Sequence, residues 1–348
     1  MRRRRFLTGS GAALAATFVR GLASAGPAAE GLIRPKALRA GAIVGLITPG
    51  TAVSDPDRLA LAARTLKFFG LRMRMGKNVG RRSSDFGSSI DERLDDLHAM
   101  FRDPEVDAVF CVRGGYGSAH LLDRIDYDLL RRNPKIFLGY SDITVLHLAI
   151  HKLARLVTFH GPVMISSFTN YTQQYFRKAL FETQPIGRAG NPPVTNELRP
   201  SHPLRTIRPG RASGPLVGGN LTLISTTLGT PYEIETRGKI LFVEDVGEEP
   251  YSIDRLLTHL RVAGKLDGVA GVIFGECEDC GPSDYKPSLA SPYTLGEVVE
   301  NILGRLKVPV LSGLTIGHTA DQLTLPLGVN ATLDADAGIL EIKEAGVV

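Results

Sequence analysis

Short apolar runs alternate with amphipathic stretches between residues 41 and 190, a pattern typical of a parallel sheet covered by helices. Apolar and β-branched residues predict strands at 43–48, 71–75, 108–112, 136–139 and 156–159. Apolar residues at helical spacing predict helices at 55–69, 91–101 and 142–153. Residues 41–190 are therefore expected to form one α/β domain.

The pattern changes in the second half of the chain. Residues 191–213 are rich in proline and polar residues without a sustained period, which predicts a linker. Beyond residue 214, strands are expected at 239–243 and 268–274, and helices at 252–263 and 295–306. Many short strands separated by glycine and proline predict a β-rich C-terminal domain over 214–348, of an α+β or barrel-like kind.

The first 25 residues have a composition of their own. Arg2 to Arg5 form a basic head, small apolar residues follow, and Ala23-Ser24-Ala25 has the small-x-small form that signal peptidases cut. The order Arg3-Arg4-Arg5-Phe6-Leu7 is typical of the twin-arginine route. Residues 1–25 thus predict a signal peptide and a periplasmic or exported protein, with a linker over 26–40. An uncleaved anchor or a basic arm is the alternative, but the apolar run is shorter than the roughly 20 residues that span a bilayer.

The net charge of +5 belongs to this leader. Five of the 41 basic residues lie in the first 25 positions, so the rest of the chain carries 36 basic and 36 acidic residues. A neutral chain gives no electrostatic reason to expect a nucleic acid or a membrane surface as a partner.

Three cysteines are too few to hold the fold together. Cys111 lies in an apolar run, where burial is expected. Cys277 and Cys280 form a C-x-x-C pair without a second pair or a nearby histidine to complete a metal set. A disulfide, a redox site and two thiols packed in a loop all remain possible for this pair.

Ser141 follows an apolar strand and precedes a helix, at the strand end where open α/β sheets put their sites. A serine there can be a nucleophile, with the Asp142 N–H facing any negative charge that develops. Ile143 stands where the second glycine of G-x-S-x-G would be. The pattern alone favours the simpler interpretation, that Ser141 caps the helix.

A glycine loop, Arg113-Gly114-Gly115-Tyr116-Gly117-Ser118, follows the preceding strand and should lie on the same edge of the sheet. Its glycines let backbone N–H groups approach a ligand, so the loop can supply an oxyanion donor, and Arg113 can hold a carboxylate. His120 replaces the third glycine of a dinucleotide fingerprint, which excludes that motif. The alternative is a structural turn with a surface arginine.

The histidines and acidic residues include several candidates for a general base and for its acidic partner. His147 and His151 have zincin spacing, but Leu148 replaces the glutamate of that motif, so no metal site is expected. His318 lies in a loop between expected strands, where an imidazole can face a cleft. Four carboxylates cluster in the segment 244–249, and spacing does not select one of them.

Eight segments together resemble the LD-carboxypeptidase family of serine peptidases, the muramoyltetrapeptide carboxypeptidases. In chain order they are Asp91-Glu92-Arg93, Arg113-Gly114-Gly115-Tyr116-Gly117, Gly139-Tyr140-Ser141-Asp142, His160-Gly161-Pro162, Gly218-Gly219-Asn220-Leu221, Glu244-Asp245, Gly317-His318 and Leu325-Pro326-Leu327-Gly328. They follow the family's order and cover nearly the whole chain after the leader.

The resemblance implies that Ser141 is the nucleophile, Glu244 the acid and His318 the base. It also implies an oxyanion hole from Asp142 and Gly115, and substrate binding by Arg113 and Gly114, with no cofactor. The implied fold is a Rossmann-like or flavodoxin-like N-terminal domain and a β-rich, swivelling, barrel-like C-terminal domain, usually in a homodimer. The implied reaction is removal of the terminal D-alanine from a murein tetrapeptide through an acyl-enzyme.

Two alternatives stand beside this reaction. Some members of the family cleave peptidyl or aminoacyl nucleotide antibiotics and confer self-immunity. This chain has no tryptophan to stack on a base, although its nine tyrosines and fourteen phenylalanines could substitute, and the expected export argues against this activity. The other alternative is a non-catalytic periplasmic module that binds peptides between its domains.

Overall fold

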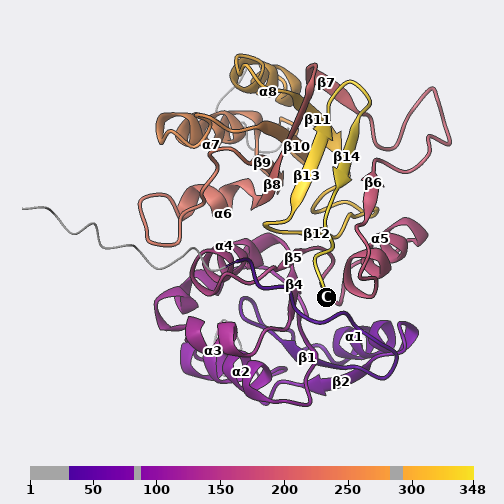
Figure 1. Cartoon of the computed structure of the whole chain (residues 1–348), viewed down its shortest axis with the longest axis vertical. Helices are drawn as coiled ribbons and strands as arrows, with labels where there is room; N and C mark the ends of the chain where they lie inside the picture. The colour runs from indigo at the N-terminus through magenta and orange to yellow at the C-terminus, as the bar shows by residue number, and fades with distance from the viewer. Residues whose placement is uncertain (1–30, 82–87, 283–292) are drawn as a thin grey trace, which may run out of the picture. The chain divides into compact units, whose positions relative to one another are not determined.

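The computed structural model describes residues 31–81, 88–282 and 293–348 (Figure 1). The predicted signal peptide and residues 26–30 of the predicted N-terminal linker lie outside these described residues. Within the described ranges, no helix has the length and apolar character needed to cross a membrane.

The N-terminal sheet has six strands in the order β12-β5-β4-β3-β1-β2. Their bounds are β1 (Ile43–Ile47), β2 (Arg72–Met75), β3 (Ala108–Cys111), β4 (Ile136–Gly139), β5 (Phe159–His160) and β12 (Leu325–Pro326). Strands β1 to β5 are parallel, and every residue of β1, β3 and β4 is buried, as expected where helices cover both faces. The predicted parallel-sheet domain is confirmed.

The helices around this sheet begin next to residues that can cap a helix N-terminus. They are α1 (Pro56–Phe68), α2 (Ile90–Arg102), η1 (Ser118–Arg124), α3 (Tyr127–Arg132) and α5 (Asn170–Leu180). In α2, Ser89 and Glu92 form a capping box, and α1 starts with Asp55 as its cap and Pro56 in its first turn.

The region after β4 differs from the single helix expected at 142–153. It runs through a 3₁₀ turn η2 (Ser141–Ile143), α4 (Thr144–Ala149) and a π-helical turn η3 (Ile150–Ala154). The strand expected at 156–159 is wrong in its bounds, because Leu156 bridges to Ile33 and β5 begins only at Phe159.

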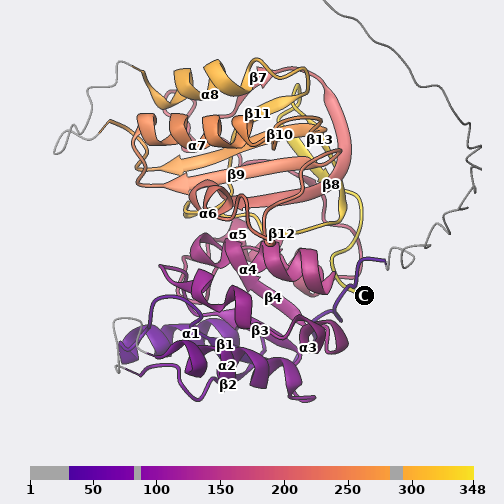
Figure 2. The same cartoon turned by 90° about the vertical axis from the view of Figure 1, so that its left-hand side faces the viewer.

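The C-terminal domain is β-rich, as predicted, with eight strands in the order β6-β14-β13-β8-β9-β10-β11-β7. Their bounds are β6 (Gly187–Ala189), β7 (Arg205–Arg208), β8 (Arg211–Asn220), β9 (Ile240–Val246), β10 (Gly271–Glu278), β11 (Val310–Leu314), β13 (Asn330–Asp334) and β14 (Ile339–Ile342). In the described part of this domain, three helices accompany them: α6 (Leu221–Thr226), α7 (Pro250–Val262) and α8 (Leu295–Leu303). Figure 2 shows α7 and α8 lying together beside this sheet.

The segment expected to be a linker, 191–213, contains β7 and the first residues of β8. Strand β7 pairs antiparallel with β11 at the sheet edge, and three of its four residues are exposed. Backbone hydrogen bonds rather than buried side chains therefore hold β7, so its sequence lacks the alternating pattern that predicts a strand.

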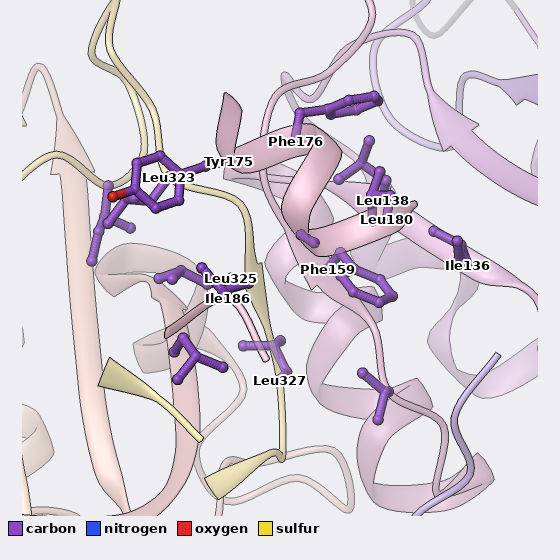
Figure 3. Close-up of a cluster of buried hydrophobic side chains, with 14 of the residues drawn as sticks. Ile136, Leu138, Phe159, Tyr175, Phe176, Leu180, Ile186, Leu323, Leu325 and Leu327 are labelled. Atoms are coloured by element: carbon purple, nitrogen blue, oxygen red, sulfur yellow. The ribbon is translucent and has the colours of Figure 1, made fainter. Parts of the chain in front are cut away.

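The two sheets share one hydrophobic core, drawn in part in Figure 3. Leu325 and Leu327, from the C-terminal part of the chain, belong to the same cluster as Leu138 and Phe159. Strand β12 pairs with β5, and the chain end is tied to the start of the described chain by the hydrogen bond from the Val348 N–H to the Pro35 carbonyl (2.9 Å). The C-terminal segment thus forms part of the N-terminal sheet.

Candidate active site

Ser141 stands on a strained turn at the carboxyl end of β4. Its φ is +65°, a left-handed conformation that costs a non-glycine residue about 1–2 kcal/mol. Tyr140 holds the cap position without a side-chain capping bond, and Ser141 Oγ lies 3.0 Å from His318 Nε2. The helix-cap interpretation of Ser141 is therefore wrong, and the strained turn has the character of a nucleophile elbow.

Glu244 is fully buried near the end of β9. Its Oε2 lies 2.8 Å from His318 Nδ1, so Ser141, His318 and Glu244 form one hydrogen-bonded line. Desolvation raises the pKa of Glu244, and the hydrogen bond to His318 opposes this shift. A carboxylate here fixes which imidazole nitrogen faces the serine.

Other carboxylates of the acidic cluster have different partners. Asp245 accepts hydrogen bonds from Asn220 Nδ2 (2.9 Å) and from the backbone N–H and hydroxyl of Thr222 (2.9 and 2.8 Å). Glu248 bonds Ser252 at the start of α7. These contacts select Glu244 as the partner of His318, which spacing could not do.

The glycine loop faces the same cavity as the serine. Arg113, Gly114 and Gly115 line it together with Ser141 and His318, and its volume is about 270 Å³. A Cβ atom at Gly114 would lie 2.9 Å from Ser141 Cβ, so only glycine fits there. The cavity thus gathers most of the residues that the sequence singled out.

Buried polar contacts fix the glycine loop. The Ser118 N–H donates to Asp142 Oδ2 (2.9 Å), so the Asp142 side chain ties this loop to the serine turn. Arg93 is also buried, and it donates to the carbonyls of Pro49 (2.6 Å) and Gly117 (3.0 Å). No role for Arg93 was predicted from the sequence. An arginine on the apolar face of the helix predicted at 91–101 was the one sign that its side chain would be buried.

The two histidines with zincin spacing have a structural role. His147 and His151 are neutral, because burial lowers the pKa of each to about 4. His147 Nε2 lies 2.8 Å from the Gly139 carbonyl, which supports the strand before the serine. Within the described ranges, no group of three or more histidine, cysteine or acidic side chains is arranged to hold a metal ion.

The C-x-x-C pair forms a disulfide between Cys277 and Cys280, and Cys111 is free and buried. Burial raises the pKa of the Cys111 thiol well above its ordinary value, so it is unreactive. The disulfide lies where β10 ends, next to Glu276.

A strained serine beside a glycine loop, with an imidazole and a buried carboxylate in line, is the arrangement of serine hydrolases. The comparisons with known proteins give the family. The LD-carboxypeptidase N-terminal domain matches residues 44–161 and the C-terminal domain of the same family matches residues 213–333. The chain belongs to the LD-carboxypeptidase family, a family of peptidases, as the motifs predict.

Relatives cover nearly the whole chain. The probable murein peptide carboxypeptidase of Bacillus subtilis is 41% identical over 319 residues, covering 90% of this chain and 95% of the relative. The crystal structure of muramoyltetrapeptide carboxypeptidase from Oxalobacter formigenes is 30% identical with a TM-score of 0.73, covering 87% and 99%.

A third relative is the microcin C7 self-immunity protein of Escherichia coli, which is 30% identical over 316 residues, covering 84% of this chain and 90% of the relative. A structure of the microcin C7 self-immunity protein without ligand gives a TM-score of 0.80 at 27% identity, covering 91% and 100%. These likenesses establish the fold and the peptidase family.

Proposed function

We propose that the protein is a serine-type LD-carboxypeptidase that removes the terminal D-alanine from murein tetrapeptides. The observation that carries the proposal is the line from Ser141 Oγ through His318 to Glu244, with both hydrogen bonds within 3.0 Å and the serine lining an open cavity. The names of the Bacillus and Oxalobacter relatives support murein peptides as the substrate class.

In the proposed first step, Ser141 Oγ attacks the scissile carbonyl while its proton passes to His318 Nε2. Glu244 holds the imidazole with Nδ1 protonated and stabilises the imidazolium that forms. The oxyanion would be stabilised by the N–H groups of Asp142 and Gly115, and removing one such donor typically costs about 10²–10³-fold in kcat.

Collapse of the tetrahedral intermediate breaks the C–N bond, and His318 gives its proton to the leaving amine of D-alanine. Water then attacks the ester on Ser141, with His318 again as the base, which releases the shortened peptide and regenerates the serine. Arg113 lines the cavity and has the planar donor fork that would hold the terminal carboxylate of the substrate.

The likeness to the microcin C7 self-immunity protein supports a second candidate, cleavage of an aminoacyl nucleotide by the same residues. One experiment separates the two: the protein is incubated with murein tetrapeptide and with an aminoacyl-adenylate analogue, and products are identified by mass spectrometry. D-alanine release supports the first proposal, whereas cleavage of the nucleotide alone supports the second. Tight binding without either product would refute both and favour a binding module.

Export and dimer formation remain proposals. The leader at 1–25 supports a periplasmic enzyme acting beside its polymer, and the family resemblance supports a homodimer. N-terminal sequencing of the secreted protein and its mass in solution test these two points.

A further inference from the structure

The loop between β11 and β12, residues 315–324, carries His318 and is held from several sides. Thr172 of α5 donates its hydroxyl hydrogen to the Ala320 carbonyl (3.2 Å) and accepts from the Gln322 N–H (2.9 Å). Asn191 Oδ1 accepts from the Thr315 N–H (2.9 Å). The position of His318 therefore depends on contacts made elsewhere along its loop.

A charged cluster makes a further contact with this loop. His202 Nδ1 lies 2.8 and 2.9 Å from the two carboxylate oxygens of Glu276, and its Nε2 lies 3.1 Å from Asp321 Oδ2. These three side chains are largely buried, with exposed fractions of 16%, 15% and 22%. Asp321 lies three positions after His318, so the cluster ties the loop to β10 and to the segment before β7.

Both ring nitrogens of His202 face carboxylates, and this decides how many protons the cluster holds. A neutral imidazole has one donor and one acceptor, and an ionised carboxylate has acceptors only. Both contacts are hydrogen bonds only if one extra proton is present, on the imidazole or on one of the two carboxyl groups. Without it, one nitrogen lone pair faces a carboxylate oxygen and the contact becomes repulsive.

The surroundings favour keeping this proton. Desolvation raises the pKa of Glu276, the hydrogen bond and the charge of His202 oppose this shift, and the nearby charges of Glu278 and Asp321 add to it, so that the pKa stays above its ordinary value. Tyr171 of α5 also faces the cluster, and its hydroxyl lies 2.7 Å from the Gly190 carbonyl and 3.0 Å from Thr315 Oγ1. Among the described residues, the titratable groups named here around His202 are therefore acidic or neutral.

We propose that His202, Glu276 and Asp321 form a proton-dependent clamp that positions the His318 loop for catalysis. His202 is a positioning residue, because it acts on the reaction through the loop and not by touching the cavity. As pH rises, loss of the shared proton opens the clamp, and activity falls on the alkaline side. The proposal rests on the proposed function for its kinetic test.

Two variants test the clamp in opposite directions. His202→Ala removes it at every pH and is expected to lower kcat by roughly 10- to 100-fold, the cost of small misplacements of catalytic groups, with little change in KM. Glu276→Gln replaces the carboxyl group by an amide of the same shape, which donates to His202 Nδ1 without a titratable proton. This variant is expected to keep activity at alkaline pH where the wild type loses it.

The matched control is His98→Ala. His98 Nε2 accepts from the Asp126 N–H (3.0 Å) in the N-terminal domain, so its loss tests for general effects of removing a half-buried histidine. It should leave the pH profile unchanged. A Glu276→Gln profile with the same alkaline fall as the wild type would overturn the clamp.

Hydrogen exchange separates failure of the clamp from failure of the proposed function. Amides of residues 315–324 should exchange faster as pH rises, after correction for intrinsic rates, in the wild type but not in Glu276→Gln. If no substrate is turned over, this exchange difference still decides the proposal, and equal protection in both proteins would refute it.

Discussion

Gly317 allows the His318 loop to approach Glu244, and its replacement by alanine is the sharpest test of the site. A Cβ atom at position 317 would lie 2.0 Å from Glu244 Oε2 and 2.3 Å from its Cδ. Oε2 is the atom that bonds His318 Nδ1, and Glu244 is fully buried. The φ of Gly317 is +90°, which adds about 1–2 kcal/mol of backbone strain for any other residue.

We expect Gly317→Ala to displace the Glu244 carboxylate and break its bond to His318. Loss of the orienting acid lowers kcat of a serine hydrolase by about 10⁴-fold, so a fall of about 10³- to 10⁴-fold is expected here. That fall corresponds to about 4–5.5 kcal/mol in the activation barrier. Strain and overpacking together should lower the free energy of unfolding by about 2–4 kcal/mol.

Gly41→Ala is the matched control. Gly41 has a φ of +80°, but among the described residues beyond its chain neighbours no atom lies within 4 Å of the position that an alanine Cβ would take, so the substitution adds strain without a clash. Its cost is about 1–2 kcal/mol of stability with kcat unchanged. Both variants are assayed by D-alanine release and by urea unfolding. If folded Gly317→Ala keeps kcat within about threefold of the control, Glu244 does not orient the base.

Three further tests concern the serine turn, the dependence on metal and the stability in acid. Ser141→Ala should abolish turnover and keep the fold. Ser141→Gly should be more stable than Ser141→Ala by about 1 kcal/mol, because glycine adopts the φ of +65° without strain. Equal free energies of unfolding for these two variants would contradict backbone strain at position 141. EDTA should leave D-alanine release unchanged, and a loss restored by zinc would revive the metal interpretation of His147 and His151. Acid should destabilise the protein, because burial lowers the His147 pKa from 6.5 to about 4 in the folded state. Between these two pH values the unfolded chain binds a proton at this histidine and the folded chain does not. Stability is therefore lost as pH falls from about 6.5 towards 4, by about 2 kcal/mol near pH 5. His147→Gln should reduce this dependence in urea titrations, with part of it left because burial also lowers the His151 pKa to about 4, and an unchanged slope would show that His147 does not contribute.

Sequence patterns predict the helices and strands that are determined by residues close to one another in the sequence. The helix at 91–101 follows from its apolar spacing and from the capping residues Ser89 and Glu92. Strands β3 and β4 follow from continuous apolar runs, since both faces of a parallel sheet are covered. These elements depend on neighbours in the sequence, so a single chain reveals them.

Features that depend on distant partners could not be predicted in this way. The contact between Ser141 Oγ and His318 Nε2 joins residues 177 positions apart, and local pattern alone favours a helix cap instead. Leu156 bridges to Ile33 rather than extending β5, and β7 exists because β11 offers an edge. The proposed role of His202 could not be predicted from the sequence, because its two acidic partners, Glu276 and Asp321, lie in other segments of the chain. The proposed triad was predicted from the resemblance to the family, because the local sequence pattern around each residue did not identify it.

The return of β12 to the N-terminal sheet has a consequence for how the protein is made. Ser141 leaves the ribosome long before Glu244 and His318, and β12 follows all three. A growing chain therefore carries the serine without the other two residues of the proposed triad, in a sheet that still lacks its edge strand. The proposed triad is complete only after the last part of the chain is synthesised, so a truncated product would lack the proposed activity.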